Sequence, residues 1–201
     1  MRAARHHLVA AVVGVAAFVG GGASADLWVH HGSEHLPGDL PVDSLDEGIA
    51  LPFTVAVPAA RGCPDYAFDA PLPDPGAVGP TSDRTFHLSA SPMAAILVVC
   101  LPDAGGSAEA VVAHHLAVPI SDGTHITDGP VLVRSAFGEA FRIDTQFGTT
   151  GPTIREWYTD HDGVVIVVGL IFYPGADVAG STSIVESMLT SWTWHLRPVD
   201  G

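Results

Sequence analysis

The chain has 201 residues, of which 22 are acidic and 8 are basic, so its formal net charge is −14 at pH 7. A surface this acidic repels the phosphates of nucleic acids and anionic lipid headgroups, and we therefore expect no nucleic-acid partner. Hydrophobic residues make up 47% of the chain. This length and composition predict one globular domain with its own core.

The first 25 residues have the three parts of a secretory signal peptide. A short basic start precedes an apolar, glycine-containing run over residues 8–22, and Ala23 and Ala25 provide the small side chains that signal peptidase requires. The run is shorter than the roughly 20 residues of a spanning helix. We predict that residues 1–25 are removed and that the mature protein begins near Asp26, secreted or otherwise outside the cytoplasm. If the segment stays uncleaved, it would anchor the chain to the membrane.

The two cysteines, Cys63 and Cys100, predict a disulfide. An even pair of cysteines in an exported chain is most simply explained by a bridge. Two isolated thiolates are too few for a structural zinc site, and the sequence has no Cys-x-x-Cys redox motif.

The first half of the mature chain predicts few regular elements. Residues 26–49 are rich in His, Gly, Pro and acidic residues without periodicity, which indicates a loosely ordered N-terminal segment before a domain over 50–198. Residues 51–58 alternate apolar and small or polar positions, as a strand does. Five prolines and four aspartates over residues 64–83 predict a long surface loop, which the disulfide would pin to the body of the domain.

The second half predicts strands and two helices. Residues 85–89 fit a short strand, and the apolar run over 94–101 fits a central strand buried on both faces. A helix is expected near 107–117, with Ser107 as its N-cap. Four further strands are expected over 131–134, 139–147, 154–159 and 164–173. The last helix is expected near 183–193, opened by a Ser183-x-x-Glu186 capping box before an apolar stripe.

This order of strands and helices resembles a known family. The resemblance spans residues 51–194, and the segments 53–58, 138–143, 158–173 with its Asp162-Gly163 turn, and 184–188 carry it. In these segments the chain resembles proteins of the PsbP-like fold and, among them, the LpqN-type secreted proteins of actinobacteria. The resemblance implies an α+β fold, an α/β/α sandwich around a largely antiparallel sheet in a single domain, usually accessory and not enzymatic. Lipoprotein members carry a Cys after the signal where this chain has Asp26, so we expect no lipid anchor.

The histidines are the candidate metal ligands. His30, His31 and His35 lie together, and the His-x-x-x-His spacing of the last two suits Zn²⁺ or Cu²⁺ if the segment is helical. Gly32 and the nearby prolines disfavour that helix, so a solvated polar segment is the alternative. We expect no cofactor, because no phosphate-binding glycine loop or calcium loop is present.

The sequence favours a non-enzymatic function. It has no Gly-x-Ser-x-Gly elbow, and we predict no catalytic residues. Trp157, Tyr158 and Trp194 are candidates for a binding surface, with core packing as the alternative. We expect an extracellular or envelope accessory protein that binds a small apolar ligand or a protein partner. Two alternatives stay open, namely a secreted hydrolase with Ser, His and Asp from distant positions, and a metal-binding protein using the His30–His35 segment.

Overall fold

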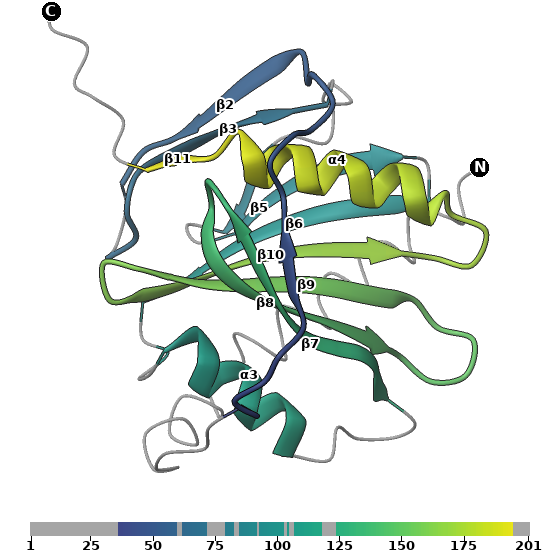
Figure 1. The fold of residues 1–201 in the computed structure, drawn as a ribbon. Helices are drawn as coiled ribbons and strands as arrows, with labels where there is room; N and C mark the ends of the chain where they lie inside the picture. The colour runs from purple at the N-terminus through teal and green to yellow at the C-terminus, as the bar shows by residue number, and fades with distance from the viewer. Residues whose placement is uncertain are drawn as a thin grey trace, which may run out of the picture.

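The computed structural model describes residues 36–59, 62–71, 79–82, 85–91, 93–102, 104, 107–117 and 124–194. The predicted signal peptide and the candidate metal ligands His30, His31 and His35 lie outside these residues. Figure 1 shows a large curved sheet with helices on its two faces and a small sheet above it.

Within the described residues the large sheet has eight strands, and neighbouring strands run antiparallel except at one edge. Its strands, in spatial order, are β1 (Val42–Ser44), β7 (His125–Ser135), β8 (Gly138–Gln146), β9 (Thr153–His161), β10 (Val164–Phe172), β6 (Ala94–Leu101), β5 (Thr85–Ser91) and β4 (Gly79–Ser82). The exception is β1, which pairs with β7 in parallel. The small sheet contains β11 (Thr193–Trp194), β3 (Tyr66–Ala70) and β2 (Phe53–Val57), in that order.

The helices cover opposite faces of the large sheet. Helix α4 (Val178–Thr190) packs with the small sheet on one face, where Trp192 stacks on Tyr66 and Phe68. Helix α3 (Ala108–Ala117) packs on β8 and β9 on the other face. Each strand of the sheet centre therefore buries both its faces, and all nine residues of β10 are buried. Neither described helix has the length and apolar character needed to cross a membrane.

Most of the expected elements are confirmed, and so is the fold class. The expected strands over 51–58, 94–101 and the four late segments correspond to β2, β6 and β7 to β10. The helix expected near 107–117 is α3. Ser107 caps its N-terminus, because the Ser107 Oγ accepts the Ala110 N–H at 3.2 Å. The single α+β domain with a largely antiparallel sheet between α3 and α4 agrees with the prediction.

Two expectations are wrong. The surface loop expected over residues 64–83 contains the buried strand β3 and the strand β4. The last helix begins at Val178, five residues before the expected Ser183, and its N-cap is Asp177, whose Oδ1 accepts the Gly180 N–H at 3.0 Å. Ser183 lies inside the helix, where its hydroxyl donates to the carbonyl of Ala179.

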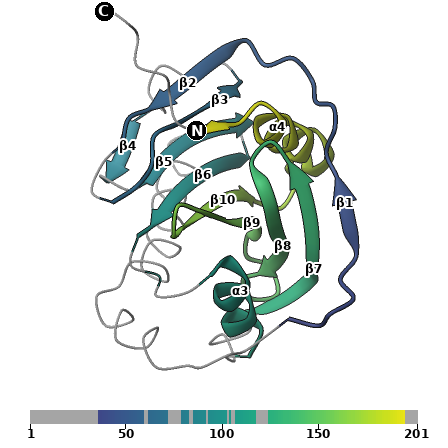
Figure 2. The same cartoon turned by 60° about the vertical axis from the view of Figure 1, so that its left-hand side comes forward.

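Residues 36–57 wrap around the domain as a strap (Figure 2). The strap starts at α3, where the Leu36 N–H donates to Glu109 Oε1. It follows the sheet edge as β1 and reaches α4, where the Ile49 N–H donates to Ser187 Oγ at 2.8 Å. The side chains of the strap show no periodicity, because main-chain groups make its hydrogen bonds with α3, β7 and α4, and such bonds leave no side-chain pattern.

The predicted disulfide is present. Cys63, just before β3, is bonded to Cys100 of β6, with a Cα–Cα distance of 6.1 Å. Because β3 belongs to the small sheet and β6 to the centre of the large one, the bridge fastens the two sheets to each other. It therefore fixes the layer that encloses the aromatic core around Trp192.

Candidate functional site

Strand β9 places polar groups on both faces of the large sheet. Successive side chains of a strand point to opposite faces. Ile154, Glu156 and Tyr158 therefore lie on the α3 face, where Tyr158 packs in the core beneath α3. Arg155 and Trp157 lie on the α4 face, where Trp157 belongs to the larger core. The α3 face is the candidate functional site, because it holds a carboxyl group inside an apolar surface.

Glu156 is buried next to a glycine in the middle of the sheet. Only 8% of the residue is exposed, and its partner on β10 is Gly169. A side chain at Gly169 would have Leu97 Cβ and Glu156 Cγ as its nearest described neighbours, at 3.8 and 4.0 Å. The surrounding residues on this face are apolar and at most 2% exposed, namely Leu97, Ile154 and Ile171. Glycine inside a strand often marks a place where another group approaches the sheet closely.

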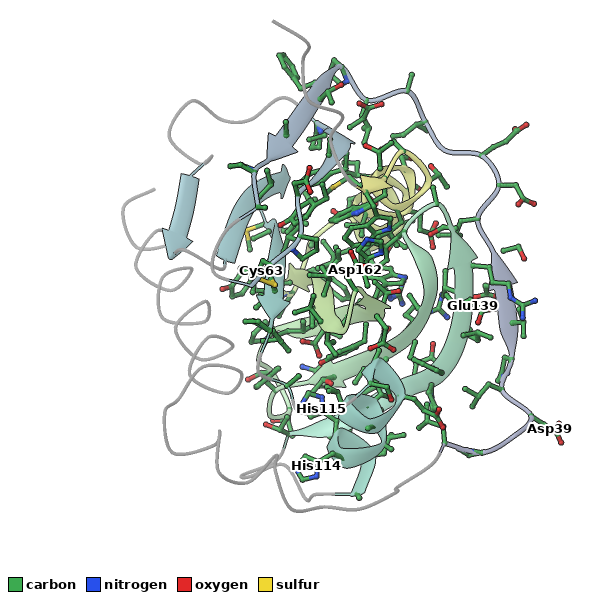
Figure 3. All side chains as sticks on the ribbon, turned by 90° about the vertical axis from the view of Figure 1, so that its left-hand side faces the viewer. Asp39, Cys63, His114, His115, Glu139 and Asp162 are labelled. Carbon is green, nitrogen blue, oxygen red and sulfur yellow. A yellow bond between two sulfur atoms is a disulfide. The ribbon has the colours of Figure 1, made fainter. Side chains whose placement is uncertain are left out.

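A second polar contact joins Tyr158 to α3. The Tyr158 hydroxyl lies 3.2 Å from His115 Nδ1, and the two rings meet edge to face at 5.7 Å. Strand β9 also holds the other end of the helix, because both Asp160 carboxylate oxygens accept the Ala108 N–H, at 2.8 and 3.0 Å. Figure 3 shows His114 and His115 together on α3, far from Cys63. Two side chains of one strand thus fix both ends of α3.

Burial changes the protonation of this group of side chains. It raises the pKa of Glu156 from 4.5 to about 7, against a hydrogen bond with Tyr158 that lowers it. It lowers the pKa of His115 from 6.5 to about 4, and neighbouring His114 adds to that effect. Burial, and then the charge of Glu156, hold the pKa of the Tyr158 hydroxyl well above 10. Near pH 6 the carboxyl, phenol and imidazole are therefore all neutral.

The arrangement can donate or accept hydrogen bonds. Three of the described serines have structural roles. Ser107 caps α3, and Ser183 and Ser187 donate to carbonyls one turn earlier in α4. No three His, Cys, Asp or Glu side chains within the described ranges are grouped to hold a metal ion.

The three predicted binding residues do not form one surface. Trp157 is fully buried on the α4 face, and Tyr158, with 1% exposure, is buried on the α3 face. Trp194 lies at the rim of the larger core, where its ring stacks on His161 with centroids 3.9 Å apart and on Phe137 at 5.8 Å. Of the three, Tyr158 is the one that contributes to the candidate site.

Comparisons with known proteins give likenesses of fold. The structure is similar to LpqN of Mycobacterium tuberculosis, a protein involved in cell envelope biogenesis, with 14% identity, a TM-score of 0.44, and coverage of 72% of this chain and 91% of LpqN. It is similar to PsbP (CyanoP) of Synechocystis, with 12% identity, a TM-score of 0.40, and coverage of 74% and 96%. A protein of Bacteroides thetaiotaomicron has 8% identity and a TM-score of 0.37, with coverage of 66% of this chain and 46% of that protein. No protein-family model and no curated protein matches the chain. These likenesses extend to the fold alone, in line with the resemblance drawn from the sequence.

Neither Glu156 nor His115 stands out from the sequence as a site residue. The available signal was the alternation along residues 154–161. In a strand buried on both faces, this alternation puts Glu156 and Tyr158 on the same side. A charged residue in such a strand then marks a buried polar group that needs a partner.

Substitution of Glu156 by Gln should change how stability depends on pH. A group whose native pKa is raised loses its stabilising effect as pH rises, so Glu156 makes wild-type stability fall between pH 4.5 and about 7. His115 has the opposite effect, because its lowered pKa makes stability fall as pH drops from 6.5 to about 4. Between pH 4.5 and pH 6.5 the effects of Glu156 and His115 on stability oppose each other. Because E156Q lacks this titrating group, its stability should gain about 3 kcal/mol relative to wild type between pH 4.5 and pH 8.

Urea unfolding at several pH values between 4 and 9 measures this difference. Glu139→Gln is a matched control, since the Glu139 side chain lies on the adjacent strand but is 66% exposed. A difference between E156Q and wild type that stays constant with pH would show that Glu156 titrates normally in the folded protein.

Proposed function

We propose that the chain is an extracytoplasmic, non-enzymatic accessory protein that binds a small apolar ligand on the α3 face of its large sheet. The disulfide between Cys63 and Cys100 supports the location, because such bridges persist in oxidising compartments. The net charge of −14 supports solubility and disfavours nucleic acid. The structural roles of Ser107, Ser183 and Ser187 favour binding over hydrolysis.

The single observation that carries the binding proposal is the position of Glu156 beside Gly169. Binding sites for small molecules are mostly apolar, with a few polar groups that fix the orientation of the ligand. Leu97, Ile154 and Ile171 would contact the apolar body of the ligand, and the carboxyl group of Glu156 would bind its one polar group. Because these residues are buried, binding requires this face of the sheet to open locally.

The test uses N-phenyl-1-naphthylamine, a neutral apolar fluorophore with one N–H donor. Wild-type protein should increase its fluorescence in a saturable manner. Gly169→Val places methyl groups over the sheet beside Glu156 and should weaken binding by roughly tenfold. The smaller variant Gly169→Ala is measured beside G169V, because a Cβ at Gly169 makes only ordinary contacts with its described neighbours and its φ is not in the positive range, so its fold should survive.

Gly38→Val is the matched control, because no described atom lies within 4 Å of a Cβ at that position of the strap. It should bind the fluorophore as wild type does, and thermal melting should show that both variants are folded. Equal binding by G169V and wild type would remove the α3 face as the site. Turnover of ester, peptide or glycoside substrates that disappears on replacing one Ser or His would favour the hydrolase instead.

A further inference from the structure

Strand β2 forms one edge of the small sheet. The strand order is β11-β3-β2, so β3 pairs with one side of β2 and no strand of the described residues pairs with the other (Figure 1). Ala56 is exposed, and 40% of Phe53 is exposed. An edge strand presents main-chain donors and acceptors that can pair with a further strand.

The contacts of β3 show which main-chain groups of β2 point outward. In an antiparallel pair, two opposite residues either exchange main-chain hydrogen bonds or both point their main-chain groups away from each other. The Asp69 N–H and the Ala67 C=O bond to side chains at the end of α4 and in β11, on the side of β3 away from β2. Their partners on β2 are Thr54 and Ala56. The N–H and C=O of Thr54 and Ala56 therefore point to the free side of β2.

The other described sheet edges carry features that block a further strand. Strand β1 has three residues, and its Asp43 carboxylate accepts from Arg142. Strand β4 contains Pro80 with a register shift beside it, and β11 has two residues. Short strands, charges, prolines and bulges are the usual means of protecting an edge. Strand β2 has five residues with no charge, proline or register shift among them, so it is open to a partner.

Two prolines set the length of this open edge. Main-chain groups alternate in direction along a strand, so positions 52 and 58 share the outward direction of Thr54 and Ala56. Both positions are proline, which has no N–H to donate. A partner strand can therefore pair along β2 but cannot continue past Pro52 or Pro58.

The charges around the edge favour a basic partner. The Thr54 hydroxyl donates to Asp69 Oδ1 at 2.7 Å, so a carboxylate lies on the Thr54 face of the sheet, one strand in from the edge. The arginines that the structure describes lie on β7, β8 and β9, where each is paired with a carboxylate. The net charge of the chain is −14. An acidic segment would be repelled at this edge, whereas a basic one would be attracted.

We propose that the edge of β2 binds a short, basic, extended segment of a partner protein, which joins the small sheet as an additional strand. The main-chain groups of Thr54 and Ala56 would bond to the segment, as in other cases of strand addition. Apolar side chains of the segment would continue the layer of Val55 and Val57, which pack against the larger core. Its Lys or Arg side chains would lie on the opposite face, toward Asp69. This surface is separate from the α3 face of the large sheet.

The probe is a capped peptide of alternating Lys and Val residues with the length of β2, added to the intact protein. Hydrogen exchange followed by NMR reports each amide. Without peptide, the amides of Thr54 and Ala56 should exchange rapidly, and saturating peptide should slow their exchange at least tenfold. The Val55 amide points to β3 and should change little. Binding should weaken as the salt concentration rises, because salt screens the attraction between the charges.

Two variants and two peptides serve as controls. Ala56→Pro removes an outward N–H and leaves the pairing with β3 intact, since proline is tolerated on an edge strand. It should weaken peptide binding roughly tenfold. Ala56→Thr keeps the N–H and should bind as wild type does. A peptide with Glu in place of Lys, and a Lys-Val peptide that is N-methylated at every residue, should not bind. G169V should bind the Lys-Val peptide normally, which keeps this test separate from that of the proposed ligand.

Three results would overturn the proposal. The first is equal binding of the Glu-containing or the N-methylated peptide, and the second is binding that leaves the exchange of Thr54 and Ala56 unchanged. The third is slow exchange of these two amides without peptide that depends on protein concentration, which would assign the edge to a second copy of the chain. If A56P does not fold, the exchange of Thr54 and Ala56 in the wild-type protein decides the question.

Discussion

Replacement of both cysteines, Cys63→Ala with Cys100→Ala, should lower the free energy of unfolding by about 4 kcal/mol. The bridge spans 37 positions, and closing a loop of that length removes conformational entropy from the unfolded chain. The effect should be large here because the bridge joins β6 of the large sheet to the start of β3 in the small sheet. Without it, the aromatic core around Trp192 depends on packing and on the hydrogen bonds of β3 with β11 and Ser191.

Guanidinium unfolding followed by tryptophan fluorescence measures the loss, and wild-type protein kept in reductant is the control. The double variant and reduced wild type should agree, since Ala removes the bridge and little else. Intact mass before and after alkylation should show no free thiol in the unreduced protein. Two thiols that react without reduction, or a variant as stable as the oxidised wild type, would show that the bridge does not form or does not matter.

The central strands of the large sheet were predictable because they are buried on both faces and their residues are apolar. Strand β6 is apolar over its whole length, and every residue of β10 is buried. The turn between β9 and β10 was predictable from Asp162-Gly163, where both residues have positive φ. Local sequence and final structure agree at these positions, so the pattern alone is sufficient.

The elements that the sequence missed depend on distant partners. Strand β3 lies between Pro64 and Pro71 and is stabilised by pairing with β2 and with β11, which is more than 120 residues away in the chain. The start of α4 was missed because Ser183 and Glu186 imitate a capping box. Asp177 provides the real cap. The first turns of α4 hold Ser181 and Thr182, which are poor helix formers but are buried in the fold.

The candidate site could be predicted only in part, for a physical reason. Tyr158 stands out in the sequence as an aromatic residue. Glu156 can be recognised as a buried carboxyl group only when both faces of β9 are known to be buried. The sequence gives no sign that His115 of α3 meets Tyr158, since 43 positions separate them. A site assembled from a helix and a strand in this way has no local motif.

Substitution of Arg155 by Met should lower the free energy of unfolding by about 3 kcal/mol. The Arg155 guanidinium binds the Asp144 carboxylate with two hydrogen bonds, of 2.8 and 2.6 Å, and donates a third to Thr182 of α4 at 3.1 Å. The Asp144 side chain is only 9% exposed, so removal of the cation leaves a buried charge without its partner. The loss should be at the lower end for buried pairs, because the Arg155 side chain remains 18% exposed to screening water.

Two further variants show whether the effect comes from burial of the charge. Arg134→Met removes an arginine whose Nε donates to Glu139 at 2.8 Å, the distance at which Arg155 Nε donates to Asp144, but both side chains of this pair are more than half exposed. Its loss should be no more than about 0.5 kcal/mol, as for surface pairs. Arg155→Met combined with Asp144→Leu should recover most of the stability, since it removes the stranded carboxylate as well. If R155M and R134M lower the free energy of unfolding by the same amount, the Arg155–Asp144 pair on the α4 face is solvated in the folded protein. It then stabilises the fold no more than a surface pair does.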